Sequence, residues 1–306
     1  MGEAPGAEER QLRILVLVHE FPPIGGGGGR VAFDLGKRLA ERGHVIDIVT
    51  MGFLGLPRYE ERDGMRIYRV PCLRRKAEIS YTDEKITYVL SAVPLVRRLI
   101  RQRGYDVIHC HFIVPAGLIA YLAGGRIPYV ITCHGSDVPG YNPDYYSREH
   151  KLMGPIWRRI VGKAALITSP SETVKGLVGA AWRGNGLPDV RVIPNGFPAE
   201  RFACSRRDRK ILLVTRMLPR KGVQYFLQAI EGLKLDYEVH IVGEGPMRAE
   251  LEELAKRTPT PVKFWGWLDN ASDELRELYE TSAIFVFPSL SENFPVVLLE
   301  AMAAGL

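Results

Sequence analysis

The sequence lacks the features that define several large protein classes. No stretch approaches the ~20 consecutive apolar residues that a membrane-spanning helix requires. Residues 1–11 are acidic and rich in small residues but have no apolar core, so they do not resemble a secretory signal. We therefore expect a soluble protein in which residues 1–11 form a disordered tail.

Cysteine is scarce, and the four cysteines show neither a CxxC motif nor the spacing of metal ligands: Cys72, Cys110, Cys133 and Cys204. Two of them, Cys110 and Cys133, fall inside predicted buried strands, where cysteine packs as a small hydrophobic residue. This usage favours a reducing, cytoplasmic compartment.

Two common nucleotide-binding signatures are missing, although a run of glycines follows the first predicted strand: Gly25, Gly26, Gly27, Gly28 and Gly29. A dinucleotide fingerprint that begins at Gly25 needs a glycine where Arg30 stands, and strand 45–50 does not end in the expected acidic residue. No Gly-Lys-Ser/Thr follows the run either, so the loop of nucleoside triphosphatases is absent. The run can still bring N–H groups at a helix N-terminus close to a phosphate or sugar. A flexible loop without function is the alternative, and the position after the first strand disfavours it.

Apolar runs alternate with helical periodicity along most of the chain, which is typical of doubly wound parallel sheets. In the first series, strands are predicted at 12–18, 45–50, 65–70, 106–110, 128–133, 165–168 and 190–193. Helices are predicted between them at 31–41, 85–103, 115–124, 149–163 and 171–180. A second series has strands at 210–215, 237–242, 262–264 and 283–287, with helices at 221–233, 246–257, 271–281 and from 295 onward.

The alternation breaks at a segment rich in proline and basic residues, and we interpret residues 196–209 as a linker. Because ~300 residues exceed what one core usually supports, we predict two domains, residues 12–195 and 210–306. Both would be doubly wound α/β domains with parallel sheets. The two would face each other across a cleft, where ligand sites are common.

Positive charge is concentrated in the first part of the chain. Residues 1–200 hold 27 Lys and Arg against 20 Asp and Glu, a net charge of +7, whereas residues 201–306 hold 14 against 15. The densest run, residues 93–103, places arginines beside an apolar stripe at helical spacing. This run can be a surface for anionic lipid headgroups or a solvated helix face above a packed one. No basic motif interleaved with aromatic residues is visible, so nucleic acid is not an expected partner.

Histidines end two predicted strands of the first domain. His134 follows strand 128–133, at the carboxyl end where open α/β sheets bind ligands. A neutral imidazole there can hydrogen-bond a sugar hydroxyl, and a charged one can stabilise a phosphate; a loop histidine bonded to local backbone is the alternative. Asp137 can cap a turn or orient a ligand. His109 and His111 point to one face of their strand, and a structural role is at least as strong an interpretation for them.

Two cations follow the first strand of the second domain. Arg216 and Lys221 lie at a strand end and a helix start, which suits a diphosphate because the helix dipole adds to their field. The loop that contains Gly245 can bring backbone close to a ligand. Trp267 and Leu268 follow the third strand, where they can wall a nucleobase or pack in the core.

Two glutamates flank a strand-to-helix turn near the end of the sequence. Glu292 lies in the loop after strand 283–287, and Pro295 suits the first turn of the following helix. Glu300 lies about one and a half turns into that helix. Both carboxylates would face a ligand crevice outside the carboxyl ends of the strands, where they can accept hydrogen bonds from sugar hydroxyls.

In their order and placement, these features resemble the GT4 family of retaining glycosyltransferases, which have the GT-B architecture of two facing Rossmann-like domains. The resemblance runs from the first strand to the end of the chain. In the first domain it rests on the glycine run, the loop His134-Gly135-Ser136-Asp137 and Pro194-Asn195-Gly196 at the hinge. In the second domain it rests on Arg216 with Lys221-Gly222, Gly243-Glu244-Gly245-Pro246, and Glu292 with Glu300.

The resemblance implies roles for the matching residues. The catalytic residues would be His134, Arg216, Lys221 and Glu292. The donor-binding residues would be Gly25, Gly26, Gly27, Gly28, Gly29, Gly245, Trp267, Leu268, Asn293, Phe294 and Glu300, and Asp137 would lie on the acceptor side. Arg216 and Lys221 would hold the donor diphosphate, and His134 would contact the transferred sugar near its anomeric carbon. Glu300 would bind the ribose and Glu292 the donor sugar.

The resemblance also implies a reaction. The sugar of a nucleotide-diphosphate donor would move, with retention at the anomeric carbon, to a glycan, a lipid-linked acceptor or another hydroxyl acceptor. Fixed cations would stabilise the charge that builds on the diphosphate, so neither a metal nor another cofactor is expected. The basic first domain would suit a lipid-linked or anionic acceptor at the cytoplasmic face of a membrane.

The sequence departs from the family pattern in two places. Pro295 stands where family members usually have glycine, so one backbone N–H contact to the donor is lost. Full-length relatives also continue for several tens of residues past the position of Leu306. We therefore expect the second domain to be incomplete, and this form to be poorly stable and weakly active or inactive.

Two other functions fit parts of the pattern. A sugar-nucleotide epimerase or phosphorylase has the same two-domain architecture but needs an acid–base constellation or a cofactor lysine, and the sequence shows neither clearly. A non-catalytic sugar-nucleotide-binding protein would have no use for the full set of cations and carboxylates. The donor base, the donor sugar and the acceptor stay open.

Overall fold

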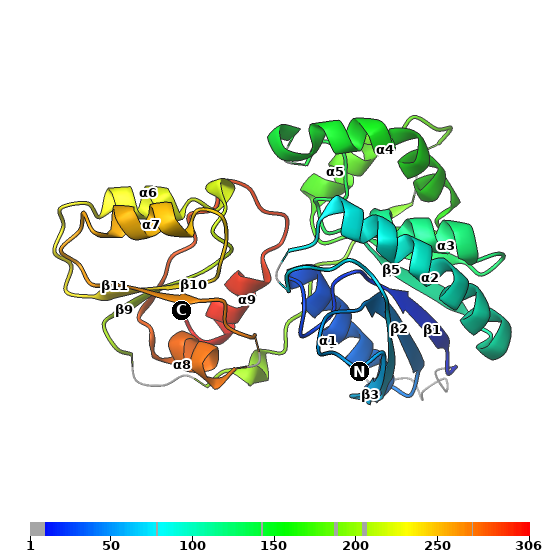
Figure 1. Cartoon of the computed structure of the whole chain (residues 1–306), viewed down its shortest axis with the longest axis horizontal. Coiled ribbons are helices and arrows are strands. Elements are labelled where there is room, and N and C mark those ends of the chain that lie inside the picture. The colour runs from blue at the N-terminus through cyan, green and yellow to red at the C-terminus, as the bar shows by residue number, and fades with distance from the viewer. Residues whose placement is uncertain (1–9, 78, 142, 187–188, 204–206, 271) are drawn as a thin grey trace, which may run out of the picture. The chain divides into compact units, whose positions relative to one another are not determined.

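The computed structural model describes residues 10–306, except residues 78, 142, 187–188, 204–206 and 271. The predicted tail, residues 1–11, lies outside the described residues apart from its last two, and so does Cys204. The chain divides into two compact units, Met1–Asn195 (unit 1) and Gly196–Leu306 (unit 2), and each has its own sheet (Figure 1).

Unit 1 is built on an eight-stranded sheet in the order β3-β4-β2-β1-β5-β6-β7-β8. Neighbouring strands are parallel, except that β3 and β4 form an antiparallel hairpin at one edge. The strands are β1 (Arg13–Leu17), β2 (Val45–Met51), β3 (Tyr59–Arg62), β4 (Met65–Val70), β5 (Val107–His111), β6 (Tyr129–Thr132), β7 (Leu166–Ser169) and β8 (Val190–Val192). The chain turns to β2 on one side of β1 and later to β5 on the other. The carboxyl ends of β1 and β5 therefore border the switch point where such sheets bind ligands.

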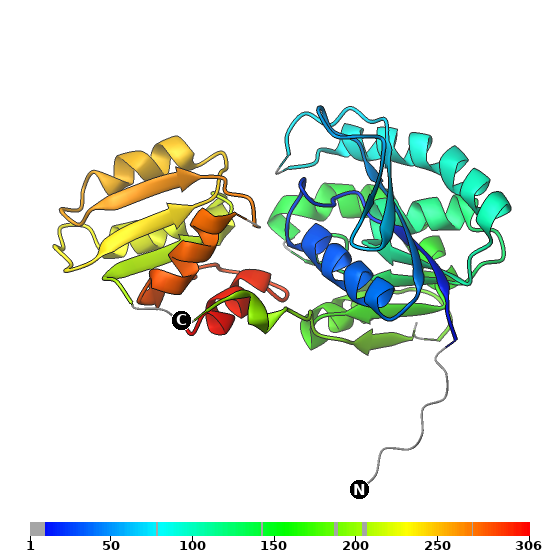
Figure 2. The ribbon, with the colours of Figure 1, turned by 90° about the horizontal axis from the view of Figure 1, so that it is seen from below.

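Helices cover both faces of this sheet (Figure 2). The helices are α1 (Gly27–Glu41), α2 (Thr82–Arg103), α3 (Leu118–Ala123), α4 (Pro143–Lys163) and α5 (Glu172–Ala181), with an irregular turn over Ile113–Gly117. One hydrophobic cluster joins α1 to β1, β2 and β4, and a larger one joins α2, α3, α4 and α5 to the opposite face. Tyr88 of α2 is fully buried, and its hydroxyl donates to the carbonyl of Val49 at 2.8 Å, which fixes α2 over the carboxyl end of β2.

Unit 2 is a four-stranded parallel sheet in the order β11-β10-β9-β12. Its strands are β9 (Lys210–Val214), β10 (Glu238–Val242), β11 (Val262–Gly266) and β12 (Ile284–Phe285). Its helices are α6 (Val223–Ala229), α7 (Arg248–Ala255), α8 (Asp273–Thr281) and α9 (Val296–Ala303), with 3-10 turns at Ala199–Arg201 and Pro219–Lys221. Helices α6 and α7 pack on one face of the sheet, and α8 and α9 pack on the other (Figure 1).

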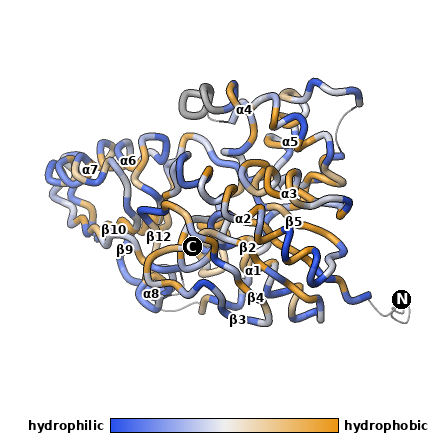
Figure 3. Tube along the Cα trace, turned by 45° about the vertical axis from the view of Figure 1, so that its right-hand side comes forward, coloured by the Kyte–Doolittle hydropathy of each residue, from blue (hydrophilic) through white to orange (hydrophobic). Residues whose placement is uncertain are grey.

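The hydrophobic pattern explains which elements are central. Four of the five residues of β1 are buried, as expected for a strand that is covered on both faces. Figure 3 shows α3 as mostly hydrophobic, whereas α7 and α8 carry hydrophilic stretches. The two surface helices of unit 2 thus bury one side only, and α3 is packed between α2 and α4.

Several elements differ from the sequence-based expectation. For example, α4 begins at Pro143 rather than at 149, and α6 covers Val223–Ala229 rather than 221–233. Helix α1 begins at Gly27 rather than at 31, because Gly29 packs against the backbone of Glu20 and tertiary contact overrides the low helix propensity of glycine. Strand β3 was not predicted, since Tyr59–Arg62 has no apolar alternation and owes its pairing to the hairpin with β4. Strand β12 is limited to Ile284–Phe285 instead of 283–287.

Candidate functional sites of the two units

In unit 1, the glycine run forms the end of a loop and the first turn of α1. The predicted loop therefore holds Gly25 and Gly26, while Gly27, Gly28 and Gly29 belong to the helix. A Cβ on Gly28 would lie 2.6 Å from the ring of Phe112 and 3.3 Å from Cγ of His134. A side chain at this position would displace both rings. The glycine run is thus packed directly against His134.

Glu20 is a residue of this site that the sequence analysis missed. It follows the buried segment of β1, and its carboxylate accepts a hydrogen bond from the N–H of Gly26 at 3.1 Å. Its charge also raises the pKa of His134 against the larger, opposite effect of burial. Unit 1 therefore has a carboxylate beside the glycine run. Its place directly after the first strand and before the glycines was the available signal.

The carboxylate of Asp137 is occupied by backbone groups. Its Oδ1 accepts from the N–H of His134 at 3.0 Å, and its Oδ2 accepts from the N–H of Ile113 at 2.7 Å. The carbonyl of the same residue accepts from the indole of Trp157. This geometry matches the turn-capping interpretation of Asp137. The residue holds the His134 loop against the irregular turn that follows β5.

His134 belongs to a group of imidazoles at the carboxyl ends of β5 and β6. Its Nε2 lies 3.1 Å from Nδ1 of His111, and the two rings are stacked at 5.3 Å between centroids. Phe112 packs between His134 and His19, at 4.5 and 4.6 Å between ring centroids. The backbone of Phe112 has φ of +79°, a strained conformation of the kind that clusters at functional sites.

Burial keeps these imidazoles neutral. It lowers the pKa of His134 to about 4 and that of His19 to about 3, and it lowers the pKa of His111 well below its ordinary value. His109 behaves alike, with a pKa lowered by burial to about 4, and its Nε2 bonds the hydroxyl of Thr132 at 2.8 Å. At neutral pH the group can therefore exchange hydrogen bonds with hydroxyls, and it does not offer positive charge to a phosphate.

In unit 2, Lys221 and Glu292 form a hydrogen-bonded ion pair. Lys221 ends the 3-10 turn after β9, and Glu292 lies in the loop after β12, the strand next to β9 in the sheet. Glu292 also accepts from the hydroxyl of Ser289 at 2.6 Å. Burial lowers the pKa of Lys221, and the neighbouring Glu292 opposes that effect. The two residues predicted to contact different parts of the donor thus contact each other.

The loops that carry this ion pair are joined directly. Gly222 has φ of +73°, and a Cβ there would lie 2.0 Å from the carbonyl oxygen of Pro288, so only glycine fits. The N–H of Leu290 donates to the carbonyl of Arg220 at 2.9 Å. The position of the Lys221 side chain relative to Glu292 is therefore set by the backbone.

The remaining predicted residues of unit 2 lie around these loops. Arg216 is exposed after β9, and its charge contributes to lowering the pKa of Lys221. Gly245 packs against the backbone of Met217. Trp267 is 42% exposed, whereas Leu268 is half-buried against the core cluster of α8 and α9. The loop before α9 holds two further predicted residues, both half-buried: Asn293 and Phe294.

Glu300 does not lie in an open crevice, in contrast to the sequence-based expectation. It is only 3% exposed, because it shares the face of α9 that packs on α8 with Ala304 one turn later. The hydroxyl of Tyr279 donates to its carboxylate at 2.9 Å, and Arg201 lies 3.7 Å from it. The carboxylate is therefore held inside unit 2 by two side chains.

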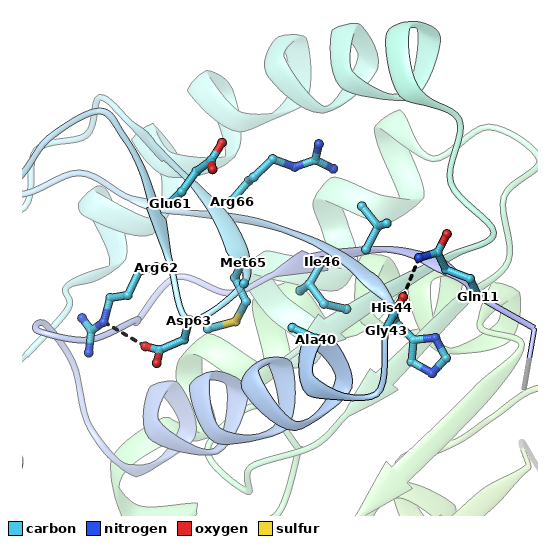
Figure 4. A pocket seen from close by; sticks show the side chains of 12 residues that line it. Gln11, Ala40, Gly43, His44, Ile46, Glu61, Arg62, Asp63, Met65 and Arg66 are labelled. Carbon is cyan, nitrogen blue, oxygen red and sulfur yellow. Dashed lines mark hydrogen bonds and ion pairs between the residues drawn. The ribbon is translucent and has the colours of Figure 1, made fainter.

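A shallow groove of about 500 Å³ lies elsewhere in unit 1, at the amino-terminal ends of β2 and β4 (Figure 4). Its lining is polar, and Figure 4 shows Gln11 bonded to Gly43 and Arg62 bonded to Asp63. The groove lies at the amino-terminal ends of the strands, whereas the predicted site lies at their carboxyl ends. None of the predicted site residues lines the groove.

Two kinds of feature are absent from the described residues. Among them, no group of three or more His, Cys, Asp or Glu side chains has an arrangement that could hold a metal ion. In the same part of the chain, none of the helices combines the length and the apolar character needed to cross a bilayer.

The two sheets, with sites at the carboxyl ends of their strands, define a protein with the GT-B fold of two Rossmann-like domains. Residues 25–201 match the model of Glycosyltransferase Family 4, and residues 208–306 match that of Glycosyl transferases group 1. The chain therefore belongs to glycosyltransferase family 4, which confirms the resemblance and supports a glycosyl transferase activity.

Individual relatives agree with this membership. The chain is 29% identical to an uncharacterized glycosyltransferase of Methanocaldococcus jannaschii, over 96% of this chain and 79% of the relative. It is 27% identical to the N-acetyl-alpha-D-glucosaminyl L-malate synthase of Bacillus anthracis, over 96% of this chain and 77% of the relative. Among solved structures, the sucrose-phosphate synthase of Thermosynechococcus elongatus has a TM-score of 0.77 at 20% identity, over 97% of this chain and 80% of that one.

Proposed function

We propose that this protein transfers a sugar, with retention of anomeric configuration, from a nucleotide-diphosphate donor to a hydroxyl acceptor. The observation that carries the proposal is the ion pair between the buried Lys221 and the half-buried Glu292, next to the exposed Arg216, at the carboxyl ends of two adjacent strands of unit 2. A paired cation and carboxylate suit a ligand that is anionic at one end and rich in hydroxyls at the other. The protein of Anabaena called HepE, which has the same fold at a TM-score of 0.70, was solved in complex with UDP-glucose. This likeness favours a nucleotide sugar as donor.

The proposed chemistry is catalysis of leaving-group departure. The bond between the anomeric carbon and the diphosphate oxygen breaks, and its electron pair stays on the diphosphate. The acceptor oxygen forms the new bond on the same face, and its proton passes to the departing phosphate oxygen. Arg216 and Lys221 would stabilise the growing negative charge, an effect worth about 3–4 kcal/mol per fixed donor. No metal is needed for this charge balance.

The neutral imidazole of His134 would serve the transferred sugar. Its pKa of about 4 leaves it uncharged at neutral pH, and an uncharged ring can hydrogen-bond a hydroxyl without attracting a second phosphate. In the glycine run beside it, no side chain would separate the backbone from a ligand. Unit 1 would thus supply neutral contacts, and unit 2 would supply the charged ones.

We also propose that α2 contacts an anionic membrane surface, where a lipid-linked acceptor would be reached from the cytoplasm. Ile86 and Leu90 are one helical turn apart and 56% and 70% exposed, and the exposed arginines Arg97, Arg98 and Arg101 follow them along α2. An apolar stripe beside a basic cluster fits the headgroup region of anionic lipids.

Vesicle co-sedimentation tests this proposal. The protein is expected to bind phosphatidylglycerol vesicles and not phosphatidylcholine vesicles. Changing Arg97, Arg98 and Arg101 together to glutamate should abolish the binding. Equal binding to both vesicles would contradict the proposal.

Donor and mechanism can be tested separately. A thermal-shift screen of UDP-, GDP-, ADP- and dTDP-sugars should reveal one preferred donor, because a ligand at a hundredfold excess over Kd stabilises the folded protein by about 2.7 kcal/mol.

NMR spectroscopy of the product made from that donor should show the same anomeric configuration as in the donor. An inverted product would refute the retaining mechanism. Turnover in the presence of EDTA is expected to be unchanged, and its loss would show that a metal is required.

The two alternative functions are separated by a simpler incubation. With the donor alone, an epimerase converts the sugar to its isomer and a phosphorylase needs added phosphate, whereas a transferase at most hydrolyses the donor slowly. A non-catalytic binding protein does neither and shows no turnover with any acceptor. Chromatography of the nucleotide sugar after incubation distinguishes these results.

A further inference from the structure

The contact between His111 and His134 has a consequence for where the protons lie. His111 ends β5 and is only 1% exposed, and its Nδ1 lies 3.1 Å from Nε2 of His134. The other nitrogen of His111, Nε2, is fully buried and has no hydrogen-bond partner among the described residues. Burial lowers the pKa of both side chains, so both rings are neutral at pH 7.

Two neutral imidazoles that share one hydrogen bond can place the proton in two ways. In the first, His111 donates its Nδ1–H to Nε2 of His134, and the buried Nε2 of His111 carries only a lone pair. In the second, His134 donates to His111, and His111 must then carry its own proton on the buried, unpartnered Nε2. Buried N–H groups without an acceptor are rarer in proteins than acceptors without a donor. The contacts therefore favour the first arrangement.

This arrangement determines what His134 can offer to a ligand. When its Nε2 accepts the bond from His111, its proton must lie on Nδ1. Nδ1 of His134 makes no hydrogen bond to the described residues, and the ring is half-buried next to the glycine run. The ring therefore presents an N–H donor, and it has no free lone pair with which to take up a proton.

We propose that His111 is a positioning residue that holds His134 in the Nδ1–H tautomer, so that His134 donates a hydrogen bond to an oxygen of the transferred sugar. This role rests on the proposed sugar transfer for its substrate, and it adds a second residue that acts through its contact with His134. It also assigns His134 as a donor rather than a general base, which leaves the proton of the acceptor to the departing phosphate.

NMR of the ¹⁵N-labelled protein can test the tautomer without a substrate. Long-range ¹H–¹⁵N correlation at pH 7 should show a protonated Nδ1 and an unprotonated Nε2 for His134, with its signals assigned by their loss in His134→Asn. The variant His111→Phe keeps a ring in the stack but removes the donor. In this variant His134 should shift toward the Nε2–H tautomer that a free neutral side chain prefers. His111→Asn, whose amide N–H can stand near the place of Nδ1–H, should keep the wild-type tautomer.

A matched control is His109→Gln, since His109 is in the same strand but bonds Thr132 instead of His134. It should leave the tautomer of His134 unchanged. With substrates, His111→Phe should lower kcat about tenfold with little change in the KM for the donor, because a contact made in the transition state is weakened. His111→Asn should recover most of that loss.

The tautomer and the function can fail independently. A wild-type His134 that is protonated on Nε2, or a His111→Phe spectrum with an unchanged His134, would overturn the positioning role whatever the enzyme transfers. If His111→Phe does not fold, the wild-type and His111→Asn spectra still decide the question. A correct tautomer together with absent sugar transfer would refute the proposed function and leave the proton assignment intact.

Discussion

The two units place their candidate sites at the same position of similar sheets but fill them with different chemistry. In unit 1, the strand ends carry histidines whose pKa is lowered by burial, so the imidazoles are neutral, and the carboxylates of Glu20 and Asp137 lie beside them. In unit 2, they carry the ion pair of Lys221 and Glu292. One backbone geometry therefore supports a neutral half, suited to hydroxyls, and a charged half, suited to a diphosphate.

The difference follows from what each kind of group needs in order to be buried. A neutral imidazole requires only hydrogen bonds, and several can share a small volume at neutral pH. A buried ammonium group needs a partner charge, because removal of that partner leaves an uncompensated charge that is strongly unfavourable. Unit 2 provides the partner from the neighbouring strand, and the joined loops keep the two side chains in place.

The largest expected effect is on the charged half. Lys221→Ala should lower kcat by about 10²–10³-fold, since a fixed donor to the leaving group is lost. Steady-state kinetics with the preferred donor measures this. Lys256→Ala is the matched control, because Lys256 pairs with Glu253 on the exposed side of α7 and should leave kcat unchanged. A kcat for Lys221→Ala within threefold of the wild type would show that the ion pair is only structural.

Acid should lower the stability of unit 1 before that of unit 2. The folded-state pKa of His19 is about 3, below its ordinary value of 6.5, so the unfolded chain binds the proton more readily between these values. Stability is therefore complete above pH 6.5 and falls as the pH decreases, by about 2 kcal/mol for His19 at pH 5. Hydrogen exchange at pH 7 and pH 5 should show a loss of protection in unit 1 that exceeds the loss in unit 2.

A pair of variants isolates this titration. His19→Gln should reduce the difference in protection between pH 7 and pH 5 in unit 1. His240→Gln should leave that difference unchanged, because His240 belongs to unit 2 and packs on Trp265. Equal acid sensitivity of the two units in the wild type would mean that the histidines do not distinguish them.

A smaller effect is expected from the glycine run. Gly28→Ala gains helix propensity, but its Cβ would lie 2.6 Å from the ring of Phe112, so overpacking opposes the gain. We expect a net loss of about 1 kcal/mol, measured by denaturant unfolding. For Gly26→Ala the nearest atom is 3.7 Å away, an ordinary contact, and stability should not fall. The prediction is wrong if the two variants are equally stable.

Apart from β3, the sequence predicted the order of strands and helices, because the buried strands are near-continuous apolar runs. It also indicated which residues follow strand ends, as for His134, Lys221 and Glu292. It could not show that Lys221 bonds Glu292, since that contact depends on β12 lying next to β9 although more than sixty residues separate them. The roles assigned to these residues stay predictions.

Side-chain direction was the weaker part of the sequence-based prediction. Glu300 was expected to face a crevice, and only the packing of α9 on α8 shows that its face is buried. The importance of His111 was likewise not predictable, since it depends on a ring nitrogen of a neighbouring strand. Glu20 was missed because a carboxylate after a strand is common, and its bond to Gly26 appears only in three dimensions.

A variant in α8 tests whether the buried carboxylate of Glu300 in unit 2 is a structural group or a donor-binding group. Tyr279→Phe removes the hydroxyl that donates to Glu300 and leaves Arg201 as the nearby cation. A carboxylate that loses one buried donor should cost about 1–2 kcal/mol of stability, measured by denaturant unfolding. If Glu300 also binds the donor ribose, the KM for the donor should rise a few-fold at unchanged kcat, because the carboxylate is less well oriented. An unchanged KM together with the full loss of stability would make Glu300 a structural residue, and unit 2 would then contact the donor through its ion pair and not through α9.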